Sequence, residues 1–387
     1  MTEWKKVRFE DLYLIPSKNG LTKPSKIRGV GYKMINMGEL FANGRIFDIP
    51  MELVPLNNAE KVKNQILVND LLFARQSIVL EGAGKCSIVM QASEMTVFES
   101  HLIRIRLNQK LASPLFYYYY FNSPYNPIKT IVNQCAQAGI RASELSEILI
   151  INPPISTQHY IATILSRYDS LIENYQCHIK LLDEAAQRLY KEWFVKLHFP
   201  GHENTKITDG LPNGWEKKKV GDLLAKVHRT KQVPTNNYHV TGSIPIIDQS
   251  RTYIAGYTDD EDCKVSVTTP YIIFGDHTRV LKFIPFSFAK GADGTQLIMS
   301  NDLQRMPQSL FYNCLIHLDL SNYSYARHFK YLKEETIIVP SNNVSLQFDK
   351  IVSKYYDCIQ QLRQQIRLLT ESRDRLLPKL MSGKIKC

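Results

Sequence analysis

The sequence lacks any apolar run of about eighteen residues, the minimum for a membrane-spanning helix, and its N-terminus lacks the apolar stretch of a signal peptide. Its seven cysteines are scattered, odd in number and contain no Cys-x-x-Cys pair. This spacing argues against a disulfide framework and against a structural zinc site. Together these absences predict a cytoplasmic protein with reduced thiols and no metal site.

The composition is that of an ordinary globular protein, with 44% hydrophobic and 22% charged residues. A length of 387 residues predicts two or three domains rather than one. Lys and Arg number 48 against 37 Asp and Glu, which gives a formal net charge of +11. This basic excess favours a polyanionic partner such as nucleic acid, although charge alone does not identify one.

The chain resembles itself at several pairs of segments, which indicates an internal duplication. At one constant shift, 150–153 aligns with 337–340 and 166–189 with 353–376; at other shifts, 4–12 aligns with 215–223 and 115–117 with 310–312. Because the shifts differ, the segments between these anchors differ in length. The ends of the two halves are therefore alike and their middles are not.

Each repeated C-terminal segment carries a stripe of apolar residues spaced alternately by three and four positions, with Arg373 in the one polar slot. The seam comprises Ile161, Leu165, Tyr168, Ile172, Ile179, Leu182 and Leu189 in the first copy and Phe348, Val352, Tyr355, Ile359, Leu362, Ile366, Leu369 and Leu376 in the second. Such a period is typical of a left-handed coiled coil. We expect two helices of roughly 35 residues, about 50 Å long, paired antiparallel within the chain. Alternatively, each stripe packs on its own domain. Pro378 should kink or end the second helix near its last turn.

The two middles combine short β-branched or aromatic runs, at 66–68, 265–267 and 271–274, with Gly and Asn turns. Aromatic stretches at 115–121 and 309–315 are predicted to be helical. We therefore predict an α+β fold with a pseudo-two-fold repeat, in which two globular α/β-mixed domains are joined by two long antiparallel coiled-coil helices. The expected segments are a first domain at 1–150, a first spacer helix at 151–197, a linker at 198–210, a second domain at 211–336 and a second spacer helix at 337–387.

Two segments imitate catalytic motifs, and both fail on spacing or residue type. Gly82-Ala83-Gly84-Lys85 resembles the end of a phosphate loop, but Val79 and Cys86 stand where that motif needs Gly and Ser or Thr. Asn152-Pro153-Pro154-Ile155 resembles the tetrapeptide of adenine methyltransferases, but its fourth residue is not aromatic and no Gly-rich cofactor turn accompanies it. We therefore predict a chain that binds rather than catalyses.

Basic and amide side chains in the two middles are the candidate DNA contacts. Arg can bind guanine bidentately, and Gln can bind adenine, in the major groove. Each candidate could instead contact phosphate or be a solvated charge. The candidates are Lys23, Lys26, Arg28, Arg75, Lys85, Arg141, Arg229, Lys231, His277, Arg279, Lys290 and Gln296.

The order of these features resembles the specificity subunits of type I restriction–modification systems. The segment Leu211-Pro212-Asn213-Gly214-Trp215 looks like that family's domain opening. Pro153-Pro154 followed by Gln158 resembles the entry into its conserved helix, and Leu189 to Phe194 the end of that helix. Segments 273–279 and 291–296 are similar to parts of one class of target-recognition domain. The resemblance covers the whole chain, except that the first opening, at Trp4, lacks the Leu-Pro lead-in.

The resemblance implies two target-recognition domains that each read one half of a bipartite, asymmetric DNA site. The paired helices would act as a spacer and would dock two methyltransferase subunits, which motor-nuclease subunits join. Methylation and cleavage, with S-adenosylmethionine, ATP and magnesium as cofactors, would belong to those partners, and this chain would need no cofactor. The alternatives are a stand-alone sequence-specific DNA-binding regulator with a coiled-coil interface and a scaffold without DNA contact.

Overall fold

The computed structural model describes residues 4–134, 138–228, 230–291, 294–322 and 327–385. The chain divides into two compact units, and each contains one part of each of two long helices. Unit 1 comprises 1–173 with 367–387, and unit 2 comprises 174–366. Among the described residues, no helix is long and apolar enough to cross a membrane.

Unit 1 is built on a five-stranded sheet in the order β2-β10-β6-β8-β4. Its neighbours are antiparallel except for β4 and β8, which are parallel. Two three-stranded sheets, β5-β3-β9 and β11-β12-β7, complete the unit. The bounds are β2 Tyr13–Asn19, β3 Tyr32–Ile35, β4 Arg45–Ile46, β5 Glu52–Val54, β6 Leu71–Ala74, β7 Gln76–Ser77, β8 Cys86–Val89, β9 Thr96–Phe98, β10 Leu102–Leu107, β11 Asn133–Gln134 and β12 Ala138–Gly139. The short helices are α1 Met37–Ala42, α2 Asn58–Asn64, α3 Pro114–Phe121 and α4 Ala142–Glu147.

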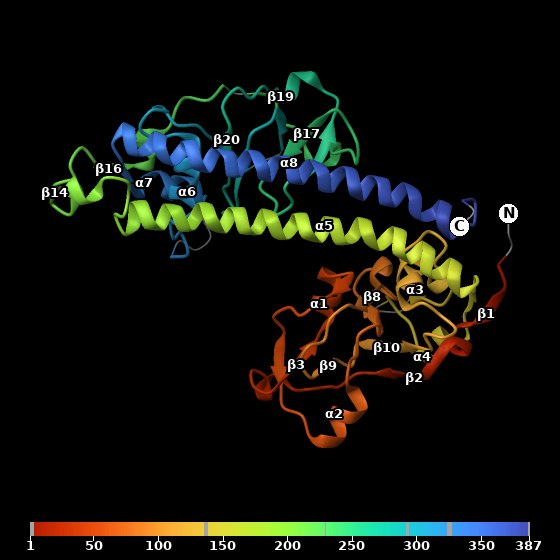
Figure 1. Cartoon of the computed structure of the whole chain (residues 1–387). Helices are drawn as coiled ribbons and strands as arrows, with labels where there is room; N and C mark the ends of the chain where they lie inside the picture. The colour runs from red at the N-terminus through yellow and green to blue at the C-terminus, as the bar shows by residue number, and fades with distance from the viewer. Residues whose placement is uncertain (1–3, 135–137, 229, 292–293, 323–326, 386–387) are drawn as a thin grey trace. The chain divides into compact units, whose positions relative to one another are not determined.

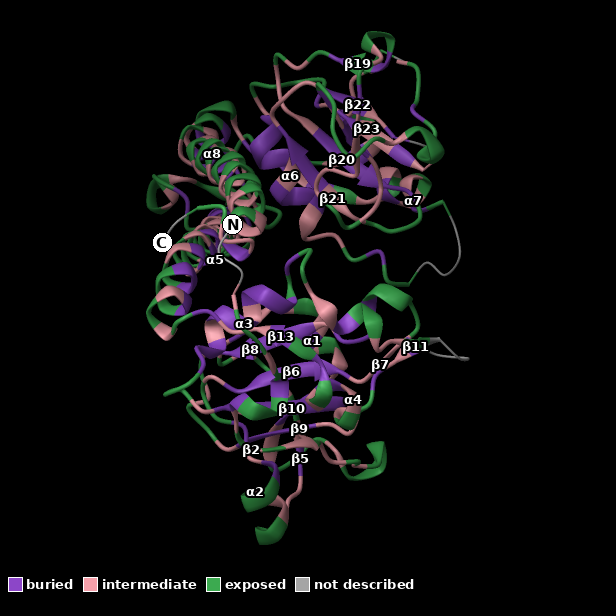
Figure 2. Cartoon of the chain, turned by 90° about the vertical axis from the view of Figure 1, so that its right-hand side faces the viewer, coloured by how far each residue is buried: buried purple, intermediate pink, exposed green. Residues whose placement is uncertain are grey.

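An aromatic cluster forms the centre of the unit 1 core. The Phe9 ring lies 4.9 Å from that of Phe121, which in turn lies 5.1 Å from Phe73. Tyr117, Tyr119 and Tyr120 of α3 are also buried, so the tyrosine run serves packing rather than exposed stacking. In Figure 2 the buried residues, drawn purple, concentrate on β6 and β10 in this unit and on β20 and α6 in unit 2.

Unit 2 contains the sheets β21-β20-β23 and β18-β17-β22-β19 and the short helices α6 and α7. The bounds are β17 Ile244–Ile247, β18 Gly256–Thr258, β19 Lys264–Val265, β20 Tyr271–Gly275, β21 Leu281–Ile284, β22 Phe288–Lys290, β23 Thr295–Ile298, α6 Gln308–Ile316 and α7 His328–Glu334. A hairpin of β14, Ile207–Thr208, and β15, Leu211–Pro212, precedes the strand β16, Glu216–Lys219. Both predicted aromatic helices, as α3 and α6, are confirmed.

The repeated ends form the same substructure in both units. In unit 1, β1 (Lys6–Arg8) pairs antiparallel with β13 (Leu149–Ile151); in unit 2, β16 (Glu216–Lys219) pairs in the same sense with β24 (Thr336–Val339). Each first strand leads into a 3-10 turn whose two apolar residues are buried, Phe9 and Leu12 or Val220 and Leu223. The internal duplication is therefore confirmed as a repeat of structure.

Two long helices follow these strands and appear in Figure 1 as the continuous ribbons α5 and α8. Helix α5 spans Ile155–Tyr190 and continues as a π-helical turn at Lys191–Val195, and α8 spans Asn342–Met381. In unit 1 the start of α5, with Ile161 and Leu165, shares a core with the end of α8, with Leu380. In unit 2 the end of α5, with Leu189, shares a core with the start of α8, with Phe348. The α+β fold with two long antiparallel helices is confirmed.

Helix α8 contains Pro378 in its last turn and ends at Met381; Leu380 and Met381 are buried in the unit 1 core. Two of the predicted strands are wrong in whole or in part. Residues 66–68 form no strand; the Asp70 carboxylate accepts the amide N–H of Leu67 at 2.8 Å and closes a turn there. Of the predicted run 265–267, only Val265 belongs to a strand.

Candidate nucleic-acid interface

The loop after the central strand of each unit is framed by matching backbone hydrogen bonds. In unit 1, the Arg75 N–H donates to the carbonyl of His101 and the Arg75 carbonyl accepts from Ile140. In unit 2, the Asp276 N–H donates to the carbonyl of Gly294 and the Asp276 carbonyl accepts from His328. The loops that begin at Arg75 and Asp276 are thus structurally equivalent. They differ in length and residues, since one extends to β8 at Cys86 and the other to β21 at Leu281.

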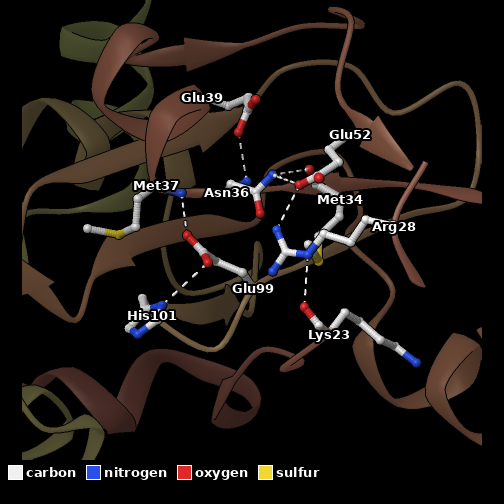
Figure 3. A network of polar contacts seen from close by, with 9 residues as sticks. All are labelled: Lys23, Arg28, Met34, Asn36, Met37, Glu39, Glu52, Glu99 and His101. Atoms are coloured by element: carbon white, nitrogen blue, oxygen red, sulfur yellow. Dashed lines mark hydrogen bonds and ion pairs between the residues drawn. The ribbon is translucent and has the colours of Figure 1, made fainter. Parts of the chain in front are cut away.

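Three of the predicted DNA contacts in unit 1 are engaged inside the protein. Lys23 forms an ion pair with Glu60 at 2.8 Å. Arg28 pairs with Glu52 at 2.7 Å and donates to the Lys23 carbonyl; Figure 3 shows its guanidinium within this network. The Lys85 ammonium donates to the Phe41 carbonyl at 2.8 Å and lies over the Phe41 ring. Burial lowers the pKa of Lys85, which is typical of an ammonium that has lost part of its water shell.

The other three predicted contacts of unit 1 are available to a ligand. Lys26 and Arg141 are exposed, and Arg75 is half-buried. Among the described residues, the side chains of Arg75 and Arg141 have neither a carboxylate partner nor a hydrogen-bond acceptor. Arg75 and Arg141 lie close together, because Ile140 donates to the Arg75 carbonyl and β12 pairs with β7 in between. The structure therefore gathers two unpaired guanidinium groups beside the loop that follows β6.

In unit 2, His277 and Arg279 lie on the short loop between β20 and β21, and both are exposed. The backbone of Arg279 has a φ of 60°, a left-handed conformation uncommon for a side chain with a Cβ. Gln249 anchors this loop, since its side-chain oxygen accepts the His277 N–H and its carbonyl accepts the Thr278 hydroxyl. The Arg279 guanidinium donates to the Leu320 carbonyl at 3.0 Å, which leaves further N–H donors for a ligand.

A hollow of about 360 Å³ elsewhere in unit 2 has both Lys290 and Gln296 in its lining. Its other polar lining residues, His228, Thr230 and Gln232, were not among the predicted contacts. The Thr230 hydroxyl is buried without a partner in the described part of the chain. Nothing in the sequence pattern marks these residues, because the strands that carry Lys290 and Gln296 reach them only through tertiary pairing.

The last two candidates are Lys231 and Arg229. Lys231 forms an exposed ion pair with Asp260 at 2.7 Å, and this carboxylate raises the pKa of Lys231. Arg229 lies outside the described residues, as do positions 292 and 293 of the segment 291–296. No group of three or more His, Cys, Asp or Glu side chains able to hold a metal ion occurs in the ranges that the structure describes.

Every residue of the predicted helix seam is buried or half-buried. Its ends belong to the domain cores, with Ile161 and Leu165 in unit 1 and Phe348, Val352 and Ile359 in unit 2. The apolar stripe of each long helix thus packs on the other long helix and also on the adjacent domain. Both predicted kinds of packing are present. A polar link crosses the seam in unit 1: Arg373 of α8 pairs with Asp169 of α5 at 2.5 Å, and Asp169 accepts the Tyr119 hydroxyl at 2.6 Å.

Comparison with known proteins places these features in a family. The family model for the type I restriction modification DNA specificity domain matches residues 1–182. The chain is 27% identical to the type I restriction enzyme MjaIX specificity subunit of Methanocaldococcus jannaschii over 301 residues, which cover 70% of this chain and 68% of that protein. It is 29% identical over 99 residues to the EcoR124I/EcoR124II specificity subunit of Escherichia coli, across 25% of this chain and 24% of that one.

A solved structure shares the fold. The chain is similar to the S subunit of a type I restriction–modification system from M. genitalium, with a TM-score of 0.62 and 17% identity. The alignment covers 98% of this chain and 96% of that subunit.

Proposed function

Because the chain belongs to the specificity subunits of type I restriction–modification systems, we propose that its two units read the two halves of a bipartite, asymmetric DNA site. Specificity subunits recognise DNA and are not catalytic. In this proposal, residues 1–150 and 211–336 are target-recognition domains, 151–197 and 337–387 are spacer helices, and 198–210 is the linker. The chain works in the cytoplasm with its DNA.

The observation that carries this proposal is the duplicated frame around unlike loops. The same backbone hydrogen bonds hold Arg75 and Asp276, yet the loops that start there differ in length and chemistry. A rigid frame fixes where a loop meets DNA, and the side chains on the loop select the bases. Two equal frames with different loops support two different half-sites.

The paired helices have a second role in the proposal, as the dock for two methyltransferase subunits and as a ruler between the half-sites. With α5 at 36 residues, a rise of 1.5 Å per residue gives a length of about 54 Å. That length can span two readers on one DNA face separated by one helical turn, about 34 Å. The partners would carry the chemistry: methyltransferase subunits with S-adenosylmethionine, and motor-nuclease subunits with ATP and magnesium.

The first experiment co-expresses this chain with the methyltransferase subunit encoded beside it, purifies the complex and maps the modified adenines. The expected result is a stable complex and a target of two unlike half-sites separated by a fixed gap. A palindromic target would contradict two different readers. Specific DNA binding by the chain without any methyltransferase association would instead support the stand-alone regulator.

A second experiment tests the ruler. Insertion of one heptad into both α5 and α8 keeps the seam in register and should lengthen the preferred gap. The matched control inserts the same number of residues into the exposed linker 202–206, where no change of gap is expected. An unchanged gap in the heptad variant would refute the ruler.

A further inference from the structure

The loop between β6 and β8 in unit 1 exposes three consecutive apolar residues. Ile78 is 92% exposed, Val79 58% and Leu80 45%. Soluble proteins commonly expose single apolar side chains, but a contiguous exposed group marks a contact surface. The equivalent loop of unit 2 runs only from Asp276 to Val280 and carries His277 and Arg279 instead. The apolar tip is therefore a feature of one unit and not of the shared frame.

The base of this loop is held tightly. The Ser77 hydroxyl accepts the Val79 N–H, and a 3-10 turn spans Leu80–Gly82. Gly82 and Gly84 sit where a Cβ would lie 2.2 Å from Ser77 Oγ and from Ile128 Cγ2, respectively. The Lys85 ammonium fastens the loop's end to the Phe41 carbonyl at 2.8 Å. The tip therefore projects from a fixed support, and ordering it on binding costs little entropy.

Hollows flank the tip on both sides. One of about 440 Å³ is lined by Met37, Phe41, Gln76, Ser77, Ile78 and His101. The other, of about 670 Å³, has Leu80, Phe121, Lys129 and Val132 in its lining. The tip is thus a ridge between two depressions, a shape that suits insertion into a groove with walls on either side.

The surroundings of the ridge are cationic. Arg75, Arg141 and Lys129 lie next to it and make no ion pair within the described residues. Arg75 is adjacent in sequence, Arg141 follows the strand β12 that pairs with β7, and Lys129 lines the same hollow as Leu80. Glu81 is an exposed acid on the ridge itself. Three unpaired cations around an apolar ridge complement the phosphates on either side of a DNA groove.

We propose that Ile78, Val79 and Leu80 form an apolar wedge that inserts against a base-pair step in the half-site bound by unit 1, while Arg75, Lys129 and Arg141 hold the flanking phosphates. The wedge rests on the proposed DNA-reading function and deepens it. Apolar side chains that enter a base step unstack it and kink the duplex. Because the equivalent loop of unit 2, Asp276–Val280, has no such apolar tip, one half-site is distorted and the other is not.

The test uses the full chain in complex with its methyltransferase subunits. In the DNA, 2-aminopurine replaces adenines of each half-site one at a time, except the adenines that are methylated, because methyltransferases extrude their target base. With the unmodified complex, fluorescence should rise on binding at positions in one half-site only. The double variant Ile78→Ser/Val79→Ser should abolish this rise and weaken specific binding about 10- to 100-fold. Its salt dependence should stay the same, because no phosphate contact is removed.

The matched control is Val62→Ser on α2, whose side chain is 82% exposed in the same unit. It should change neither fluorescence nor affinity, and all variants should keep the melting temperature because the altered side chains are exposed. Lys129→Gln should weaken specific and non-specific binding alike and reduce the salt slope by about one.

Three outcomes would overturn the wedge. One is equal fluorescence and affinity in the double variant and the unmodified complex. Another is fluorescence gain in both half-sites. A third is loss of methyltransferase association in the double variant, which would make the ridge a protein-docking surface. Absence of any sequence-specific binding by the unmodified complex would overturn the proposed function as well, so the two failures are distinguishable.

Discussion

Removal of the Asp169 carboxylate should destabilise unit 1 strongly. The side chain of Asp169 is only 7% exposed and links three helices, since it pairs with Arg373 of α8 at 2.5 Å and accepts the Tyr119 hydroxyl of α3 at 2.6 Å. Asp169→Ala leaves both partners without this acceptor. Loss of one member of a buried ion pair costs about 3–5 kcal/mol, and an unsatisfied buried hydroxyl costs about 1–3 kcal/mol.

The expected loss of unfolding free energy lies at the lower end of the range for a buried ion pair. Arg373 is 28% exposed and keeps a second partner in Asp374 at 2.8 Å, so solvent and that carboxylate compensate for part of the lost pair. We expect Asp169→Ala to lower the free energy of unfolding by about 3 kcal/mol. Urea unfolding of the full chain, followed by the fluorescence of its tyrosine-rich core, measures this as a lower midpoint at unchanged slope.

Two further variants serve as controls for Asp169→Ala. Asp374→Ala removes a carboxylate that is 55% exposed and should cost below about 1 kcal/mol, as surface pairs do. In the double variant Asp169→Ala/Arg373→Met, no unpaired guanidinium remains, so part of the lost stability should return. A loss of unfolding free energy below about 1 kcal/mol for Asp169→Ala would show that this polar link does not hold the three helices together. The same conclusion would follow if the loss in the double variant equalled the sum of the losses in Asp169→Ala and Arg373→Met.

Three other predictions concern unit 2, a loop glycine and base selection. Burial lowers the pKa of Lys282 to about 8 from its ordinary 10.5. Between these two pH values the unfolded chain binds more protons than the folded chain. The free energy of unfolding should therefore rise with pH over this interval, by up to about 3 kcal/mol. Lys282→Met should remove that rise, and equal slopes of unfolding free energy between pH 8 and 10 in both proteins would contradict it. Gly84 has a φ of 76°, and a Cβ there would lie 2.2 Å from Ile128, whereas a Cβ at Gly201, with a φ of 86°, would meet open space. Gly84→Ala should therefore lower the melting temperature clearly more than Gly201→Ala. Equal decreases in the two variants would contradict a steric clash at Gly84. Gln296→Ala should cost about 1–3 kcal/mol in specific binding and relax the choice of base at one position, whereas a uniform loss over all sequences, measured by methylation of a randomised target, would make Gln296 a phosphate contact.

Much of the frame could be predicted because its signals are local in sequence. The three-four spacing of apolar residues fixes which face of α5 and α8 is buried, wherever that face packs. The aromatic stretches that became α3 and α6 are dense enough in apolar residues to require a core. Duplication added independent support, since a pattern that occurs twice in one chain is unlikely to be accidental.

The binding surface was harder to predict, because the fate of a charge depends on residues far away in sequence. Lys23 and Arg28 look like solvated cations in the sequence, yet Glu60 and Glu52 from later elements neutralise them. Lys85 is fastened to a carbonyl of α1. Arg75, by contrast, lies beside Arg141 and forms no ion pair with any of the described residues. Sequence spacing contains no information on these pairings.

The duplicated frame, the two long helices and the apolar face of each follow directly from the sequence, because periodicity and repetition are properties of neighbouring residues. The tertiary structure alone reveals the rest. It shows that α8 includes Pro378 and ends with Leu380 and Met381 buried, that Lys290 and Gln296 share a hollow, and that Ile78 is exposed at the tip of a loop. These features depend on strand pairing and burial between distant segments, and the energy of such contacts exists only once the chain is folded.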